Sequence, residues 1–314
     1  MSMSEDHTSG AGGMAEQQAP GLLASELREG YAEVGDNVRL HYVEAGDGPL
    51  IVLLHGFPEF WFGWRQQITP LAAAGFRVVA PDMRGYNVSS RPAGLAPYAA
   101  EKLADDVRRL IRERGAESAL VVGHDWGGTV AWYTAMNHPE VVDRLAILNA
   151  AHPRKLSHGL RNLGQLRKSW YFFFFEVPEL PDAIVHADRW RFFRHFLRDA
   201  RPPYTPEEID RYIEAWSQPG AAAAMINYYR ESVRQSPHAE AQLRPISAPT
   251  LVIWGQGDRY LGPELAEPDH DDVPNLDRVE RLPDASHWVH HDEPERVTEL
   301  LIEFFSPALP TENR

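Results

Sequence analysis

The stretch Leu120-Val-Val-Gly-His-Asp-Trp-Gly-Gly128 decides the fold. An apolar run ends at a glycine, two polar residues and a tryptophan follow, and a pair of glycines opens the next segment. This order predicts a buried strand, a sharp turn and the start of a helix, with Asp125 at the turn. Small residues are needed on both sides because the turn is tight and the helix packs closely against the strand. The spacing is that of a nucleophile elbow, in which a serine usually occupies the position of Asp125.

A carboxylate at this position needs no activating base, because it is already ionised at neutral pH. Asp125 could therefore attack a carbon atom directly and form an ester. The alternative interpretation is structural: a buried aspartate that caps the helix beginning near Trp126. The spacing of the elbow does not by itself decide between these two roles.

The other strong pattern is a series of short apolar runs without alternation, which predicts strands buried on both faces, as in a parallel sheet. These runs are Leu50–Leu54, Arg77–Ala80, Ala119–Val122, Leu145–Leu148 and Leu251–Trp254. A hairpin with turn residues Gly35, Asp36 and Asn37 precedes them. Helical patterns lie between or after the strands, at Ala99–Glu113, Gly127–His138 and Pro294–Phe305. The alternation predicts an α/β fold with a mostly parallel sheet and helices on both faces.

Residues 152–240 break this alternation, since they are aromatic and helical in pattern and contain no convincing strand. We therefore expect a helical cap inserted into an α/β core made of residues 26–151 and 241–308. Residues 1–25 are rich in Ser, Gly, Ala and Gln and are predicted to form a disordered tail. Residues 309–314 are predicted to form a second, C-terminal tail.

Composition excludes several classes of protein. The chain has 314 residues and no cysteine, which rules out disulfides, thiolate metal sites and a cysteine nucleophile. Its net charge of −14 argues against nonspecific binding to nucleic acid or to anionic membranes. No apolar run approaches the ~20 residues needed to span a bilayer, and the first residues lack a signal-peptide pattern. A cytoplasmic protein that binds neither nucleic acid nor a membrane is the expectation.

Three further segments bring polar groups to the predicted carboxyl edge of the sheet. The loop 55–58, His-Gly-Phe-Pro, can aim the backbone N–H of Phe57 at the point that the N–H of Trp126 faces, and two such donors form an oxyanion hole. The alternative is a plain Gly-Pro turn. Asp258 follows the strand TLVIWG, and His287 lies in ASHWVHHDEP. The order Asp125, Asp258, His287 is that of nucleophile, acid and histidine in a catalytic triad.

Both later residues have competing interpretations. Asp258 could be a turn residue in GQGDR. His290 and His291 compete with His287, but they run into an acidic turn that we expect to be solvated. His287 follows Asp-Ala-Ser at the end of an expected strand and is the better candidate.

Together, HGFPEFWFGWR, DMRGYNVSSRP, VVGHDWGG, WGQGDRYLG and ASHWVHHDEPERV resemble, in this order, the soluble epoxide hydrolases of the α/β-hydrolase superfamily. The resemblance implies that Asp125 is the nucleophile, Asp258 the charge-relay acid and His287 the base that activates water. It also implies oxyanion N–H groups from Phe57 and Trp126. One departure is Asn87, where the family has a glycine. Asparagine tolerates the left-handed conformation, so the loop is expected to survive.

The resemblance further implies two cap tyrosines that hydrogen-bond the epoxide oxygen and donate a proton as the ring opens. It places the first at Tyr171 and the second at Tyr229, with Tyr228 as a competitor. Adjacent residues on a helix point about 100° apart, so only one of the last two can face the site. The alternative for each tyrosine is apolar packing with its hydroxyl at the surface.

The implied activity is hydration of an epoxide to a vicinal diol through an aspartyl ester, with no metal or organic cofactor. Four residues are expected to contact a small apolar substrate: His55, Pro58, Trp126 and Phe172. An exposed patch on the cap would permit a homodimer.

A haloalkane dehalogenase is the first alternative, because it uses the same nucleophile and the indole of Trp126 would suit a halide. Against it, Phe57 stands where that family has an asparagine, and a halide leaving group needs no proton from a tyrosine. A haloacetate dehalogenase fits less well, because Trp-Gly-Gly-Thr and not basic residues follows Asp125. A non-catalytic binding protein on the same scaffold is the remaining alternative, although no triad residue is missing.

Overall fold

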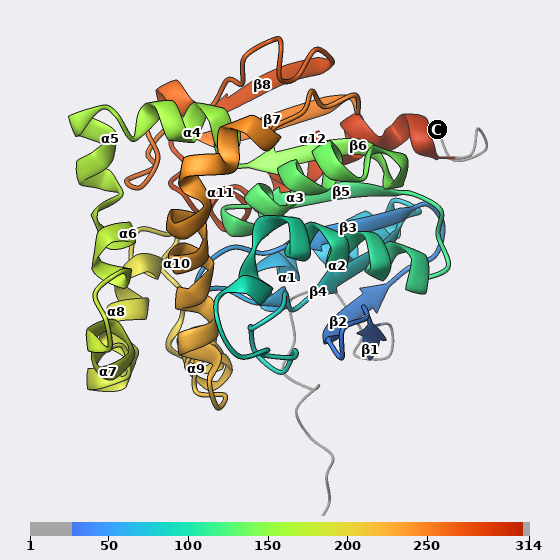
Figure 1. Cartoon of the computed structure of the whole chain (residues 1–314). Helices are drawn as coiled ribbons and strands as arrows, with labels where there is room; N and C mark the ends of the chain where they lie inside the picture. The colour runs from blue at the N-terminus through green and yellow to red at the C-terminus, as the bar shows by residue number, and fades with distance from the viewer. Residues whose placement is uncertain (1–26, 310–314) are drawn as a thin grey trace, which may run out of the picture.

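An eight-stranded sheet forms the centre of the protein (Figure 1). The computed structural model describes residues 27–309, so the predicted tail at residues 1–25 and residues 310–314 of the other tail lie outside it. Strand order across the sheet is β1-β2-β4-β3-β5-β6-β7-β8. The strands are β1 Arg28–Glu33, β2 Arg39–Ala45, β3 Leu50–Leu54, β4 Arg77–Pro81, β5 Ala119–His124, β6 Val142–Leu148, β7 Thr250–Gly255 and β8 Leu276–Leu282.

The sheet is antiparallel only at one edge, where β1 pairs with β2 and β2 with β4. All pairings from β4 to β8 are parallel. The five predicted apolar strands are confirmed as β3 to β7. The turn of the predicted hairpin is also confirmed, because Gly35, Asp36 and Asn37 all have positive φ. Asn87 adopts the expected left-handed conformation, with φ 42°, and its amide donates to Asp82 Oδ2 at 2.8 Å.

Alternate residues of the central strands point into two separate apolar layers. Val52, Val121 and Ile147 belong to the layer beneath α2 (Ala100–Glu113) and α3 (Trp126–Asn137). Their neighbours on the same strands belong to the layer beneath α1 (Arg65–Ala73) and α12 (Pro294–Phe305). Because helices cover both faces of the sheet, successive residues of each central strand are all buried, and the strand sequences are continuous apolar runs. The predicted α/β fold with helices on both faces is confirmed.

The chain between β6 and β7 contains helices and no strand in the described residues, as predicted. These helices are α4 Pro153–Gly159, α5 Leu163–Lys168, α6 Trp170–Phe175, α7 Leu180–Ile184, α8 Ala187–Leu197, α9 Pro206–Trp216 and α10 Ala221–Ala239. They lie at one side of the sheet, next to the carboxyl ends of the parallel strands (Figure 1). Ligands of open α/β sheets bind at this edge.

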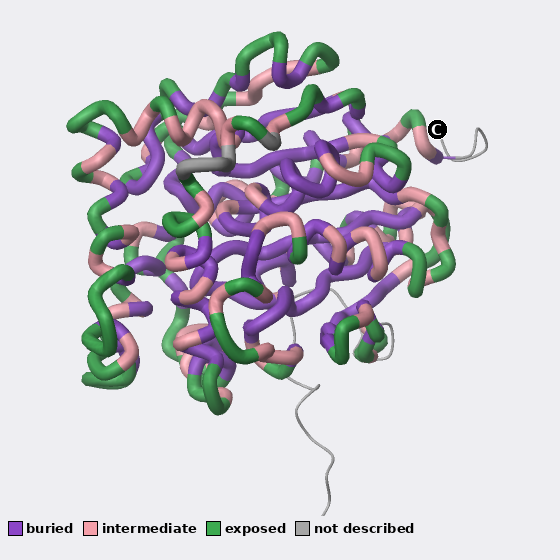
Figure 2. The backbone as a smooth tube through the Cα atoms, viewed as in Figure 1, coloured by how far each residue is buried: buried purple, intermediate pink, exposed green. Residues whose placement is uncertain are grey.

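Burial differs between the sheet and the helices that lie between β6 and β7. The central strands are buried, whereas the outer turns of α5, α7 and α8 are exposed (Figure 2). Large apolar side chains are exposed on this outer surface, at Leu163, Trp170, Phe173, Val177, Leu180 and Ile184. The expected homodimer contact stays a prediction.

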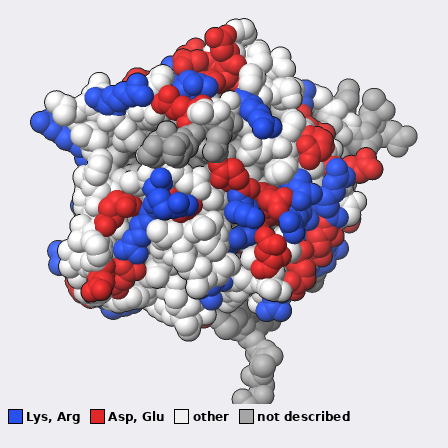
Figure 3. Space-filling model, viewed as in Figure 1, with Lys and Arg blue, Asp and Glu red and all other residues white. Residues whose placement is uncertain are grey.

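Charges of both signs are interspersed over the face shown in Figure 3, without a broad area of one sign. None of the helices in residues 27–309 combines the length and apolar character that crossing a membrane requires.

Candidate active site

The turn between β5 and α3 holds Asp125 in a conformation that few residues adopt, with φ 50° and ψ −118°. Glycines make this turn possible. A Cβ on Gly123 would lie 2.3 Å from the carbonyl oxygen of Gly127, and one on Gly127 would lie 2.2 Å from that of Leu54. The strand, the turn and the helix start are therefore as the sequence predicts. An unfavourable backbone held in place by its surroundings is typical of a functional position.

The Asp125 carboxylate does not cap α3, because its side chain makes no hydrogen bond to the helix N-terminus. Its Oδ1 instead accepts a hydrogen bond from the backbone N–H of Phe57, at 2.8 Å. Its Oδ2 lies 3.5 Å from His287 Nε2, and the side chain keeps 17% of its surface exposed. The capping interpretation is therefore excluded, and the carboxylate stands between the 55–58 loop and a histidine.

Gly56 allows this close approach. A Cβ on Gly56 would lie 2.5 Å from Asp125 Cβ and 2.9 Å from Asp125 Oδ1. The backbone N–H of Trp126 belongs to the first residue of α3, next to Asp125. Of the two backbone donors that the sequence proposes for an oxyanion hole, the N–H of Phe57 therefore contacts the Asp125 carboxylate, and the N–H of Trp126 follows Asp125 in the chain.

Asp258 orients His287. The Nδ1–H of His287 donates to Asp258 Oδ2 at 2.7 Å, which leaves Nε2 toward Asp125. The other Asp258 oxygen accepts from the backbone N–H groups of Tyr260 and Leu261, at 2.7 and 2.9 Å. Burial raises the pKa of Asp258, but the charge and hydrogen bond of His287 outweigh burial and hold the pKa below its usual value. A buried carboxylate with these partners stays ionised.

The electrostatics of His287 follow from its two carboxylate neighbours. Burial lowers the pKa of the imidazole, but the negative charges of Asp258 and Asp125 outweigh burial and raise the pKa to about 10. With Asp125 ionised, His287 therefore carries a proton at neutral pH. Loss of the charge on Asp125 would remove part of this stabilisation.

The competing histidines point elsewhere. His291 Nε2–H donates to the carbonyl of Pro202 at 2.7 Å, and its Nδ1 accepts from Arg65 at 3.0 Å. His290 Nε2 faces Glu59 Oε2 at 3.3 Å. Of the three histidines, His287 is the one that lies between Asp125 and Asp258. The expected solvated turn is wrong, because His290 and His291 are both buried.

The two predicted tyrosines come together from different helices. The rings of Tyr171, on α6, and Tyr229, on α10, lie 5.7 Å apart and nearly perpendicular. Tyr229 also contacts the rings of Trp126 and Phe57, each at 5.1 Å. Burial, reinforced by the charge of Asp125, raises the pKa of both phenols well above the usual value. Both hydroxyls are therefore neutral donors at neutral pH.

Tyr228 is occupied elsewhere. Its hydroxyl donates to the carbonyl of Arg84 at 2.6 Å, and its ring packs edge-on against Tyr86. Tyr229, one residue later on α10, faces Tyr171. The alternative that the sequence left open is thus decided by the phase of α10.

The four residues expected to contact substrate divide into two pairs. Trp126 and Phe172 both lie against the ring of Tyr229. His55 is fully buried, with Nδ1 bonded to the Gly56 carbonyl and Nε2 accepting from the Met83 N–H. Pro58 is buried, and its carbonyl accepts from the indole of Trp216. His55 has no ring nitrogen left for a substrate and instead fixes the loop.

Sequence reasoning missed two residues beside the triad. Asn149 donates to Asp258 Oδ2 at 2.7 Å and accepts from the backbone N–H of Gly255 at 2.9 Å. The ring of Tyr260 lies 5.2 Å from that of His287. Asn149 directly follows β6, and its place at a strand's carboxyl end is the signal that could have found it.

Comparison with known proteins identifies the family to which this chain belongs. The family model for the alpha/beta hydrolase fold matches residues 49–294. The AB hydrolase superfamily protein YfhM of Bacillus subtilis is 41% identical over 278 residues, which cover 86% of this chain and 95% of the relative. Human epoxide hydrolase 4 is 35% identical, over 87% of this chain and 78% of the relative. The chain belongs to the α/β-hydrolase fold family.

Solved structures give the narrower assignment. A variant of an epoxide hydrolase from Bacillus megaterium, crystallised with its product (R)-3-[1]naphthyloxy-propane-1,2-diol, is 33% identical, with a TM-score of 0.78. It matches over 88% of this chain and 100% of that one. Epoxide hydrolase A from Mycobacterium thermoresistibile is 31% identical, with a TM-score of 0.76 over 89% of this chain and 98% of that one. Within the α/β-hydrolase fold family, this chain is a member of the epoxide hydrolases.

Proposed function

We propose that this protein hydrolyses epoxides to vicinal diols through an ester on Asp125. In the first step, an Asp125 oxygen attacks a ring carbon and the carbon–oxygen bond of the ring breaks. Tyr171 and Tyr229 hydrogen-bond the epoxide oxygen, and one of them gives it a proton. The product of this step is a hydroxyalkyl ester together with one tyrosinate.

The second step hydrolyses the ester. Esterification removes the charge of Asp125, which weakens the hold of His287 on its proton, and this proton returns to the tyrosinate. Neutral His287 then takes a proton from water, and the hydroxide attacks Cγ of Asp125. The N–H groups of Phe57 and Trp126 stabilise the oxyanion. The bond from Cγ to the alkyl oxygen breaks, the diol leaves with the carboxyl proton, and Asp125 and protonated His287 are restored.

The observation that carries this proposal is the pair of buried tyrosines, Tyr171 and Tyr229, whose rings lie 5.7 Å apart. The ring of Tyr229 also packs edge-on against the indole of Trp126, at 5.1 Å between centroids. A phenol hydroxyl can donate a hydrogen bond, so both tyrosines can supply one to a substrate oxygen. A haloalkane dehalogenase would give these two hydroxyls no role, because a halide leaving group needs no proton. Phe57 supplies no second halide donor from its side chain.

The aromatic surroundings favour an apolar substrate. Phe57 packs edge-on against Phe175, Phe193, Phe196 and Tyr229. Such walls suit aryl or alkyl epoxides and offer few groups that could pair with a charged substrate. The Bacillus megaterium relative was crystallised with an aryl ether diol as its product, which agrees with this substrate class.

Turnover of styrene oxide, with detection of phenylethanediol, tests the proposal beside chloride release from 1-chlorobutane. Diol without chloride is the expected result, and Asp125→Asn should abolish it. Chloride without diol would assign the protein to the dehalogenases. If a panel of aliphatic and aromatic epoxides gives neither product, the scaffold serves as a binding protein.

A further inference from the structure

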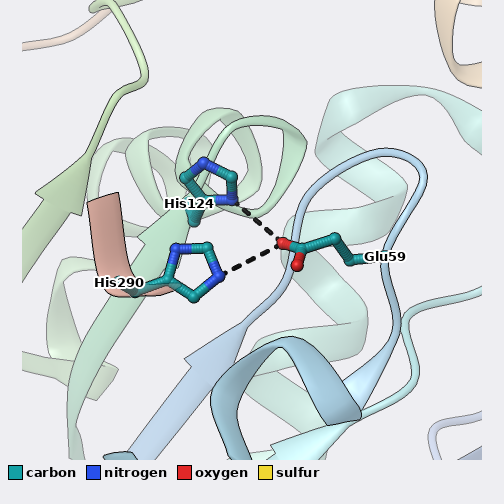
Figure 4. A group of neighbouring side chains, drawn as sticks. All are labelled: Glu59, His124 and His290. Atoms are coloured by element: carbon teal, nitrogen blue, oxygen red, sulfur yellow. Dashed lines mark ion pairs between the residues drawn. The ribbon is translucent and has the colours of Figure 1, made fainter. Parts of the chain in front are cut away.

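Three buried polar side chains meet beside the candidate active site: Glu59, His124 and His290 (Figure 4). One oxygen of Glu59, Oε2, lies 3.2 Å from His124 Nδ1 and 3.3 Å from His290 Nε2. One possible ligand atom from each residue lies within 4.8 Å of the other two. All three side chains are fully enclosed, and the proposed reaction uses none of them.

The facing atoms of this cluster do not satisfy one another. Among residues 27–309, Glu59 Oε2, His124 Nδ1 and His290 Nε2 have no hydrogen-bond partner. An N–H aimed straight at an oxygen 3.2 or 3.3 Å away could still form a hydrogen bond, so neither ring nitrogen is aligned with the oxygen. Buried polar atoms without a partner cost free energy and are uncommon in folded proteins. Three of them at one point therefore indicate a site that binds a further group.

The spacing of these atoms suits a divalent metal ion. Zinc binds histidine nitrogens and glutamate oxygens at about 2.0–2.2 Å, and a tetrahedral geometry then separates two ligand atoms by about 3.3–3.6 Å. The two contacts of Glu59 Oε2, at 3.2 and 3.3 Å, are close to this separation. No two of the three ligand atoms are more than 4.8 Å apart, so binding would draw them together by about 1.5 Å at most.

Contacts outside the cluster orient its ligand atoms. His124 Nε2 lies 2.9 Å from the backbone carbonyl of His287, and because a carbonyl can only accept, this contact requires a hydrogen on Nε2. Nδ1 is then the nitrogen available to a metal, and it is the one that faces Glu59. The hydroxyl of Tyr212 donates to the other Glu59 oxygen, Oε1, at 3.0 Å. Second contacts of this kind, which fix the ring and the carboxylate, are typical of metal ligands.

The types of the three side chains favour zinc. Imidazole nitrogens suit zinc and the neighbouring first-row metals, whereas calcium and magnesium prefer oxygen ligands. Two histidines and one glutamate form a known zinc ligand set, in which water takes the fourth position. An enclosed carboxylate also needs a partner of opposite charge, which a divalent ion supplies.

Each of the three side chains is close in sequence to a residue of the proposed site. These pairs are Glu59 with Phe57, His124 with Asp125, and His290 with His287. Glu59 lies in the loop after β3, His124 ends β5, and His290 lies on α11 (Val289–Asp292). An ion bound to all three residues would therefore fix these segments relative to one another.

We propose that Glu59, His124 and His290 bind one divalent transition-metal ion, with zinc as the best fit, and that this ion holds the three segments of the active site together. The ion is structural and takes no step in the proposed reaction. Its binding does not depend on that reaction, so the metal site and the proposed function are tested separately.

Metal content tests the site directly. Full-length protein, purified without a polyhistidine tag, is incubated with a small excess of zinc chloride, desalted and measured by inductively coupled plasma mass spectrometry. We expect about one zinc ion per chain in the wild-type protein and a loss of roughly tenfold or more in His290→Gln. His158→Gln is the matched control, because it removes an exposed histidine that lies beside a carboxylate, Glu240, and it should keep the ion. No zinc in the wild-type protein, or equal zinc in His290→Gln, would overturn the proposal.

Two measurements on the wild-type protein keep the test independent of whether a variant folds. Cobalt(II) in place of zinc should give the intense visible bands of a tetrahedral ion, and the weak bands of an octahedral ion would contradict the site. Zinc chloride should raise the Tm by several degrees, because an ion that binds only the folded state stabilises it, whereas magnesium chloride should not. No shift with zinc, or an equal shift with magnesium, would overturn the proposal.

Discussion

Removing the charge of Asp125 should convert His287 from an acid into a base at neutral pH. Asp125 Oδ2 lies 3.5 Å from His287 Nε2. With an effective dielectric constant of about 20, one charge at that distance contributes about 5 kcal/mol to holding the proton. Water reaches Asp125, so the real effect is smaller. We expect the pKa of His287 to fall from about 10 in the wild-type protein to about 7 in Asp125→Asn.

Proton NMR titration of the His287 ring measures this difference, with the resonance assigned by its loss in His287→Gln. Asparagine keeps the shape of Asp125 and removes the charge. Asp277→Asn, an exposed variant on β8, controls for the loss of one negative charge and should leave the pKa unchanged. If the pKa values of His287 in the wild-type protein and in Asp125→Asn agree within about half a unit, esterification cannot switch this histidine and the reasoning is refuted.

Three further predictions test the roles assigned to the site. His287→Gln should still be alkylated and should hold the ester, seen by intact mass as a stable adduct equal to one substrate. Tyr171→Phe together with Tyr229→Phe should slow ring opening by about 10²- to 10⁴-fold, measured as the rate of adduct formation, because no hydroxyl then donates to the leaving oxygen. Gly56→Ala places a Cβ 2.5 Å from Asp125 Cβ and should lower the alkylation rate by about 100-fold through misplacement of the carboxylate.

Each of these predictions has its own control or contrary outcome. An unmodified His287→Gln protein after exposure to substrate would show that the histidine is needed before the ester forms. Near-normal ring opening in the double tyrosine variant would show that the two tyrosines are not the proton donors. The control is Tyr228→Phe, because the Tyr228 hydroxyl binds the Arg84 carbonyl and its loss removes one buried hydroxyl outside the site. For Gly56→Ala, circular dichroism separates a misplaced carboxylate from a misfolded protein.

Stability should also depend on pH through His287. Its folded-state pKa of about 10 lies above the unfolded value of about 6.5. The stabilisation is therefore complete below pH ~6.5 and is lost as pH rises toward 10. Urea unfolding from pH 6 to 10 should show a fall in the free energy of unfolding for the wild-type protein and a smaller fall for His287→Gln. Equal falls in both proteins would contradict the assignment.

The sequence predicts those parts of the fold that depend on local signals. Apolar runs without alternation identify β3 to β7, and the glycines around Asp125 identify the turn that exposes it. The candidate triad follows from chain order, because the carboxyl ends of parallel strands bring Asp125, Asp258 and the His287 loop to one edge. These signals need no knowledge of packing.

Other features depend on tertiary packing. The choice between Tyr228 and Tyr229 depends on the phase of α10 against the site, which propensity does not specify. The sequence does not predict helix α1, because its apolar pattern is weak and Pro70 interrupts it. The sequence indicates a strand before His287 but not its bounds. This strand, β8, LDRVERL, is half-buried and rich in charged residues at the edge of the sheet.

The meeting of Glu59, His124 and His290 also depends on tertiary packing. Glu59, His124 and His290 come from three distant segments, and the sequence suggests His290 only as an alternative to His287. Each looks like an ordinary polar residue next to a motif. Their meeting at one carboxylate oxygen becomes visible only when the sheet brings the three loops together.

A single turnover in H₂¹⁸O, with enzyme in excess over styrene oxide, tests the ester on Asp125 most directly. Water that attacks Cγ leaves its oxygen in the carboxylate, so the peptide containing Asp125 should gain the label and the first diol released should contain none. Label in the diol, with an unlabelled peptide, would mean that water attacks the epoxide itself and would contradict the account.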